Sequence, residues 1–161
     1  MDAKPIIATV ARALREQDFE AILIGNAAAA LQGAPVTTVD LDFLIRKTPA
    51  NLRKLNAIAK SLDAVVFKPH YPVSGLFRLI RDDDGLQVDF MTRIHGVRSF
   101  NGLRARASEI AVDEETITVA ALPDIIASKR AADRPRDRAV IHVLEKTLRE
   151  AEAARRPEGG K

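Results

Sequence analysis

Hydrophobic residues recur along the chain with two periods, which together predict an alternation of helices and strands. Residues 5–17 carry apolar side chains at positions 6, 7, 10, 13 and 14, one stripe of a helix. Apolar runs at 19–25 and 39–45 predict two buried strands. Between them, 26–33 predicts a short helix, because Asn26 suits its first position and a glycine ends it.

The rest of the chain continues this alternation. We expect, in order, a helix at 48–62, a short strand at 64–67, a hairpin of strands 75–80 and 86–92 around the sequence RDDDG, a short helix with one or two short strands at 101–122, and helices at 122–132 and 134–156. This order predicts an α/β or α+β fold: a small mixed β-sheet flanked by helices, with a C-terminal helical pair.

The length of 161 residues predicts a single domain, and no internal repeat is visible. We expect that domain to span 1–156, with its core at 19–120 and its terminal helices at 122–156. The tail 157–161 is expected to be disordered.

Composition removes several classes of function. Without cysteine the chain cannot form a disulfide, a thiolate metal site or a cysteine nucleophile. No apolar run approaches the ~18 residues of a membrane span, and the N-terminus lacks a signal-peptide pattern, so we expect a cytoplasmic protein. The net charge of +3 fits either binding of an anion or an ordinary solvated helix face.

Two aspartates interrupt the apolar run 39–45, although carboxylates are depleted from strands. Side chains alternate along a strand, so Asp40 and Asp42 should project together from the face opposite its apolar residues. Asp89 is placed in the same way in the strand 86–92. If the two strands are neighbours, three carboxylates converge.

Three close carboxylates repel one another unless a cation lies between them. Mg²⁺ takes oxygen ligands and favours a few carboxylates with water and phosphate. Two such ions can stabilise both oxygens of a phosphoryl displacement. The alternative is that the aspartates face solvent on the wet side of an antiparallel sheet, and the residues alone favour neither reading.

The stretch LIGNAAAALQGAPVTTVDLDFLI, residues 23–45, resembles the signature of the nucleotidyltransferase superfamily of the DNA polymerase β type. In that signature a strand and a glycine turn open a short helix, a second strand carries D-x-D, and a third carboxylate lies on a later strand. The ending at 122–148 looks like that of the small bacterial AbiEii-like and minimal nucleotidyltransferases, a pattern matched by Lys129, Arg134, Arg136 and Asp137.

The resemblance implies a Mg²⁺-dependent transfer of a nucleoside monophosphate from an NTP to a hydroxyl. Asp40, Asp42 and Asp89 would be the metal ligands and catalytic residues, with two Mg²⁺ ions expected and Mn²⁺ as a substitute. The nucleotide-binding residues would be Gly25, Asn26, Thr38, Lys129 and Arg136.

The acceptor implied is RNA (tRNA among them), a protein or a small molecule. A partner protein or a homodimer would complete the site, in the manner of a toxin–antitoxin system. No membrane partner is expected.

Two departures from the signature support an alternative. Asn26 stands where relatives have Gly or Ser, and Val36 stands where many have Arg. The chain could therefore be a catalytically weak module that binds a nucleotide or a partner protein.

Other motifs are absent. His70, His95 and His142 lack zinc-ligand spacing, and RDDDG lacks the remaining ligands of a calcium loop. Ser74 lacks the frame of a hydrolase nucleophile, and the chain has no P-loop and no dinucleotide-binding glycine pattern.

Overall fold

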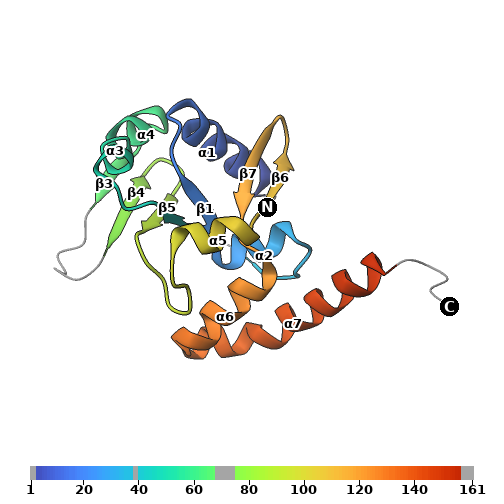
Figure 1. Ribbon diagram of the computed structural model, residues 1–161. Coiled ribbons are helices and arrows are strands. Elements are labelled where there is room, and N and C mark those ends of the chain that lie inside the picture. Colours follow the sequence, from blue (N-terminus) through green and yellow to red (C-terminus); the bar gives the residue numbers. More distant parts are fainter. Residues whose placement is uncertain (1–2, 38–39, 68–74, 157–161) are drawn as a thin grey trace.

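The computed structural model describes residues 3–37, 40–67 and 75–156, in which helices surround one mixed β-sheet (Figure 1). Its elements are, in chain order, α1 (Lys4–Glu16), β1 (Ala21–Ile24), α2 (Gly25–Leu31), β2 (Leu41–Ile45), α3 (Pro49–Leu52), α4 (Leu55–Ser61), β3 (Val65–Phe67), β4 (Leu76–Arg81), β5 (Leu86–Met91), α5 (Phe100–Arg106), β6 (Ser108–Val112), β7 (Glu115–Val119), α6 (Leu122–Ala132) and α7 (Pro135–Arg155). The predicted fold class is confirmed, including the pair of helices after the last strand.

The strands of the sheet lie in the order β3-β4-β5-β2-β1-β7-β6. β2 lies at the centre, antiparallel to β1 and parallel to β5. Antiparallel hairpins extend the sheet on both sides, through β4 and β3 at one edge and through β7 and β6 at the other. This topology brings together the ends of β1, β2 and β5, which are far apart in the sequence.

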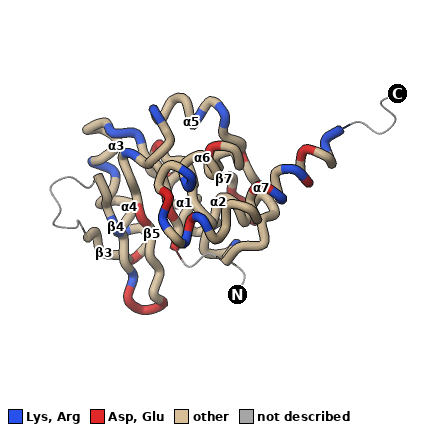
Figure 2. Tube along the Cα trace, turned by 90° about the horizontal axis from the view of Figure 1, so that it is seen from below, with Lys and Arg blue, Asp and Glu red and all other residues tan. Residues whose placement is uncertain are grey.

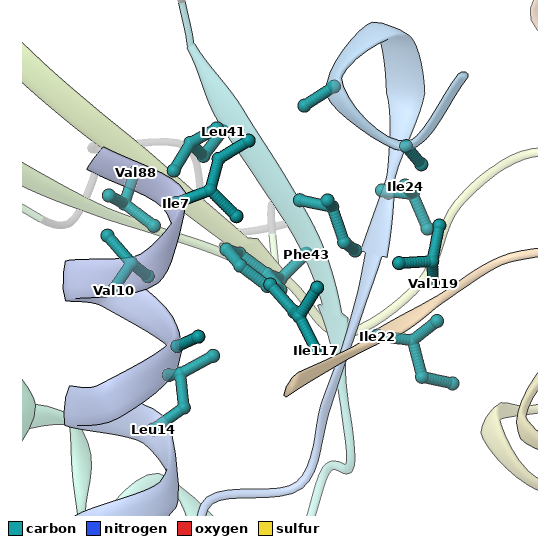
Figure 3. Close-up of a cluster of buried hydrophobic side chains, with 14 of the residues drawn as sticks. Ile7, Val10, Leu14, Ile22, Ile24, Leu41, Phe43, Val88, Ile117 and Val119 are labelled. Atoms are coloured by element: carbon teal, nitrogen blue, oxygen red, sulfur yellow. The ribbon is translucent and has the colours of Figure 1, made fainter. Parts of the chain in front are cut away.

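The hydrophobic core lies between α1 and the sheet (Figure 3). Ile7 and Val10 of α1 face Phe43 and Val88, and all four are buried. Burying each such side chain stabilises the fold by roughly 1.5–3 kcal/mol. Because strand side chains alternate, the residues between these apolar positions project from the opposite face of the sheet.

One predicted element is wrong in its continuity. The helix expected at 48–62 is two helices, α3 and α4, because the chain turns at Arg53 and Lys54. The cause is Asn51, which is only 2% exposed. Its side chain accepts a hydrogen bond from the backbone N–H of Glu20 and donates to the backbone oxygens of Glu20 and Arg46, and these contacts hold α3 against the start of β1.

Several predictions fall on residues outside the described ranges. They concern Thr38, the start of the strand at Val39, His70, Ser74 and the tail 157–161. Within the described residues, no helix combines the length and the apolar character that crossing a membrane requires.

Candidate active site

A cleft of about 680 Å³ is lined by Asp42 and Asp89, which alternate along their strands with the α1-facing Phe43 and Val88. Its walls come from the ends of β1 and β2, the hairpin β4–β5, the loop after β5, and helices α2, α5, α6 and α7. Seven of the eight candidate residues from the sequence line it, namely Gly25, Asn26, Asp40, Asp42, Asp89, Lys129 and Arg136. The eighth, Thr38, lies outside the described residues.

The acidic residues come together through the register of two strands. Asp42 lies directly opposite Asp89 on the parallel strands β2 and β5. Asp89 is buried, with 7% of its surface exposed, whereas Asp42 is partly buried. Asp40 lies just before β2 and is exposed at the rim of the cleft. The alternation of side chains thus places all three in one cleft.

The surroundings of Asp42 disfavour its ionised form. Burial, followed by the nearby charges of Asp89 and Asp40, raises the pKa of Asp42 to about 6. Lys129 and Arg136 act in the opposite direction but do not offset the rise. Because a divalent cation would lower the cost of this ionised form, the donor set fits a hard cation bound by oxygen.

Gly25, at the start of α2, allows the chain to pass close to Asp42. Its φ is +69°, and a Cβ added there would lie 3.2 Å from the Asp42 Oδ2 atom. Behind this turn α2 buries Ala27, Ala28 and Ala29 at no more than 1% exposure, so the helix packs closely on its neighbours. A glycine is therefore required both by the backbone conformation and by the space available.

Basic side chains from α6 and α7 form the opposite wall. Lys129 lies 3.6 Å from the carboxylate of Asp137, which also accepts hydrogen bonds from Arg134. Burial opposes ionisation of Asp137, yet bonds from Arg134 and the charge of Lys129 hold its pKa below the usual value. Burial also lowers the pKa of Lys129. Arg136 is exposed and lines the same wall.

Asp89 has a partner that the sequence analysis did not identify. The guanidinium of Arg78, directly opposite on β4, donates from Nε to Oδ1 at 2.8 Å and from Nη2 to Oδ2 at 3.1 Å. Gln87 donates to Oδ2 at 3.3 Å. If residues 82–85 form the turn of the predicted hairpin, position 81 pairs with 86 and position 78 with 89. The hairpin pattern in the sequence therefore could have identified this pair.

The three aspartates do not form a preformed metal cage. Among the described residues, no group of three or more Asp, Glu, His or Cys side chains is arranged to hold one ion. The expectation that all three aspartates bind the metal stays a prediction. A site of two carboxylates completed by phosphate and water remains compatible with this geometry.

The two departures from the family signature differ in their surroundings. Val36 packs against the hydrophobic core. Asn26 lines the cleft and donates from Nδ2 to the backbone oxygen of Thr37 at 3.5 Å. Its Oδ1 atom is buried and has no hydrogen-bond partner among the described residues. An acceptor in that state can take a hydrogen bond from a ligand hydroxyl or a water.

Comparison with known proteins identifies the family. Residues 3–155 match the model of a family described as "Nucleotidyl transferase of unknown function (DUF2204)". No curated protein sequence matches the chain.

Solved structures share the fold. ANT(2'')-Ia in complex with adenylyl-2''-tobramycin has a TM-score of 0.60 and 17% identity, covering 93% of this chain and 91% of that one. TM1012 from Thermotoga maritima, classed with the nucleotidyltransferases, has a TM-score of 0.54 and 19% identity, covering 91% and 92%. An antigenic nucleotidyltransferase-like protein from Paracoccidioides brasiliensis has a TM-score of 0.50 and 15% identity, covering 94% and 88%.

At identities this low, structural likeness concerns the fold alone. The family match spans nearly all of the described residues, and its description agrees with the chemistry of the cleft. The chain therefore belongs to the DUF2204 family of nucleotidyltransferases and is an enzyme of that class.

Proposed function

We propose that the enzyme transfers a nucleoside monophosphate from an NTP to a hydroxyl acceptor with the help of Mg²⁺, which Mn²⁺ can replace. The observation that carries this proposal is the position of Asp42 opposite Asp89, with Asp40 in the same cleft. The raised pKa of Asp42 supports a cation there, because like charges and burial leave the ionised carboxylate undercompensated.

Asp40 and Asp42 would hold the cation, which when bound would neutralise charge on the transferring phosphate. Lys129 and Arg136 would orient the triphosphate from the opposite wall. Gly25 keeps the floor of the cleft open beside Asp42. The Oδ1 atom of Asn26, which has no partner within the described part of the chain, would accept a hydrogen bond from a ribose hydroxyl or from water on the cation.

In the reaction, the acceptor oxygen forms a bond to the α-phosphorus as the bond to the bridging oxygen breaks and pyrophosphate leaves. Asp89 would receive the hydroxyl proton, directly or through water. Positioning and electrostatic stabilisation supply most of the rate enhancement in such a transfer. A second ion would arrive with the triphosphate, whose oxygens complete its ligands.

The cleft favours an acceptor that is not a polycation. Three of the carboxylates that line it have a basic partner: Asp89 has Arg78, Asp124 has Arg106, and Asp137 has Lys129 and Arg134. Tobramycin, whose adenylylated form is bound in the ANT(2'')-Ia structure, carries several amines, and this cleft offers them little unpaired negative charge. RNA, a protein hydroxyl or a neutral or anionic small molecule fits better.

A catalytically weak nucleotide-binding or partner-binding module is the second candidate. It is favoured by Val36, which packs on the core at the position where relatives carry an arginine. A partner protein or second copy, as in toxin–antitoxin systems, would complete the acceptor side under either proposal.

The test is a transfer assay with each α-labelled NTP, Mg²⁺ and three separate acceptor pools: total RNA, total protein and tobramycin. We expect label transfer to RNA or protein, abolished by Asp40→Asn or Asp42→Asn. Nucleotide binding without transfer in any pool would favour the weak module. Absence of both Mg²⁺-dependent nucleotide binding and transfer would overturn the proposed function, and efficient labelling of tobramycin would overturn the acceptor class.

A further inference from the structure

Arg78 uses more of the hydrogen-bonding capacity of the Asp89 carboxylate than a chance surface contact would. Its fork reaches both oxygens, and Gln87 adds a third donor, so three of the roughly four lone-pair directions of the carboxylate are used. The Asp89 side chain is 10% exposed and that of Arg78 is 32% exposed. The cross-strand register between β4 and β5 fixes the pair, since the two residues are direct neighbours.

The charges around the pair bear on where a cation can bind. Arg78 neutralises the charge of Asp89. Lys129 and Arg136 act on Asp42 from α6 and α7, and Figure 2 marks Lys and Arg in blue. A cation that used Asp89 as a ligand would also meet the positive guanidinium at close range, which is unfavourable in a partly buried site.

We propose that Arg78 is a positioning residue that keeps Asp89 outside the metal coordination of the free enzyme, so that the enzyme binds one divalent ion until nucleotide arrives. This inference rests on the proposed cation site at Asp40 and Asp42. Arg78 takes the place of a second cation beside Asp89 and fixes the orientation of its carboxylate through both oxygens. The second ion enters only with triphosphate oxygens as additional ligands.

The test counts Mn²⁺ ions bound per chain, from the paramagnetic resonance signal of the ion left free in a titration. We expect one ion for the wild type without nucleotide and two for Arg78→Met, which removes the charge and both hydrogen bonds. The double variant Arg78→Met/Asp89→Asn should return to one. Arg93→Gln is the matched control, because Arg93 lines the same cleft but is exposed, and it should stay at one.

The outcomes separate the two proposals. Failure of the wild type to bind Mn²⁺, with the same result for Asp42→Asn, overturns the proposed cation site. Two ions in the wild type without nucleotide, or a single ion in Arg78→Met, overturns only the role of Arg78.

A second measurement does not depend on folding of the Met variant. The Nε–H resonance of Arg78, assigned from its loss in Arg78→Lys, should persist when saturating Mg²⁺ is added to the wild type. Its disappearance at that point would show that the metal displaces the guanidinium, against the inference.

Discussion

Asp42 and Asp89 lie directly opposite each other on the parallel strands β2 and β5. Backbone hydrogen bonds of the sheet fix this relationship, so the two carboxylates are held together before any ligand binds. The repulsion between them is built into the fold and contributes to the raised pKa of Asp42, although burial is the larger cause. The predictions below follow from this arrangement and its surroundings.

Replacing the most perturbed carboxylate should stabilise the metal-free protein. The pKa of Asp42 is raised from 3.8 to about 6 in the folded protein, so its ionised form is penalised above pH 6. Asp42→Asn should therefore raise the free energy of unfolding by about 3 kcal/mol at pH 8. The gain should fade as the pH drops from 6 to below 3.8, because the wild-type side chain is then protonated in both states.

Thermal unfolding in EDTA at several pH values measures this effect. Mg²⁺ should then raise the melting temperature of the wild type but not that of Asp42→Asn. Asp113→Asn, an exposed aspartate in the turn between β6 and β7, is the control and should change neither quantity. Equal behaviour of the two variants would mean that Asp42 is an ordinary exposed residue.

Cation binding should itself depend on pH. Protonated Asp42 is a poor ligand, so the affinity for Mn²⁺ should be flat above pH 7 and fall by about tenfold per unit below pH 6. Titrations between pH 5 and 8 would show it. An affinity that does not change over this range would place the ion elsewhere.

The turn at Gly25 should be sensitive to a single methyl group. Gly25→Ala forces a residue with a Cβ into φ +69° and sets that Cβ 3.2 Å from Asp42 Oδ2. Gly85→Ala is a closely matched control, because Gly85 has φ +70° and open space around it. Both should lose roughly 1–2 kcal/mol from the left-handed conformation.

Only Gly25→Ala should also weaken Mn²⁺ binding, because only there does the methyl group displace a proposed ligand. Chemical denaturation and metal titration of the two variants separate backbone strain from displacement of Asp42. Equal loss of metal affinity in both would show that the approach to Asp42 is irrelevant.

Two arginines on α7 test whether the basic wall of the cleft binds the nucleotide as proposed. Arg136→Gln should weaken nucleotide binding by about tenfold, the value of one charge-assisted hydrogen bond. Arg138→Gln removes the same charge two residues later, where the side chain pairs with Asp133, and should leave nucleotide affinity within twofold. Calorimetry with a non-hydrolysable NTP gives both values. Equal losses of nucleotide affinity in the two variants would mean that Arg136 contributes only through the overall positive charge of the protein.

The attachment of α1 should be sensitive to acid. Glu115 of β7 accepts hydrogen bonds from Arg15 and Arg12, and the Arg15 bond is the main reason that its pKa falls to about 2. A depressed carboxyl pKa stabilises the fold above about pH 4.5, and that contribution is lost as pH falls toward 2. Glu115→Gln should thus lower the melting temperature at pH 7 and flatten its dependence on acid. The same dependence of melting temperature on pH in the variant and the wild type would contradict this.

The sequence was sufficient for the class of fold because its information was local. Alternation in 39–45 and 86–92 predicted two strands with an apolar and an acidic face, and both strands are present, although Leu44 and Asp89 are buried as well. The break between α3 and α4 was missed because Asn51 acts through contacts with Glu20, which is distant in the sequence. A helical pattern does not contain such tertiary contacts.

The candidate site shows the same limit. Asp40 and Asp42 were visible as a doubled charge in an apolar run, whereas Arg78 looked like one more basic residue in a strand. Its significance depends on the cross-strand register with Asp89, which a single-sequence pattern specifies only once the turn length is assumed. The roles of the gathered residues stay predictions until variants are measured.

The three buried alanines of α2 set a dimension that no substrate-facing residue controls. Alanine is the smallest side chain that still favours a helix, so these positions let α2 lie close to the elements beneath it. Ala28→Val would push the first turn of α2 outward and make the cleft shallower without altering any charge. The depth of the cleft therefore depends on three residues that do not line it.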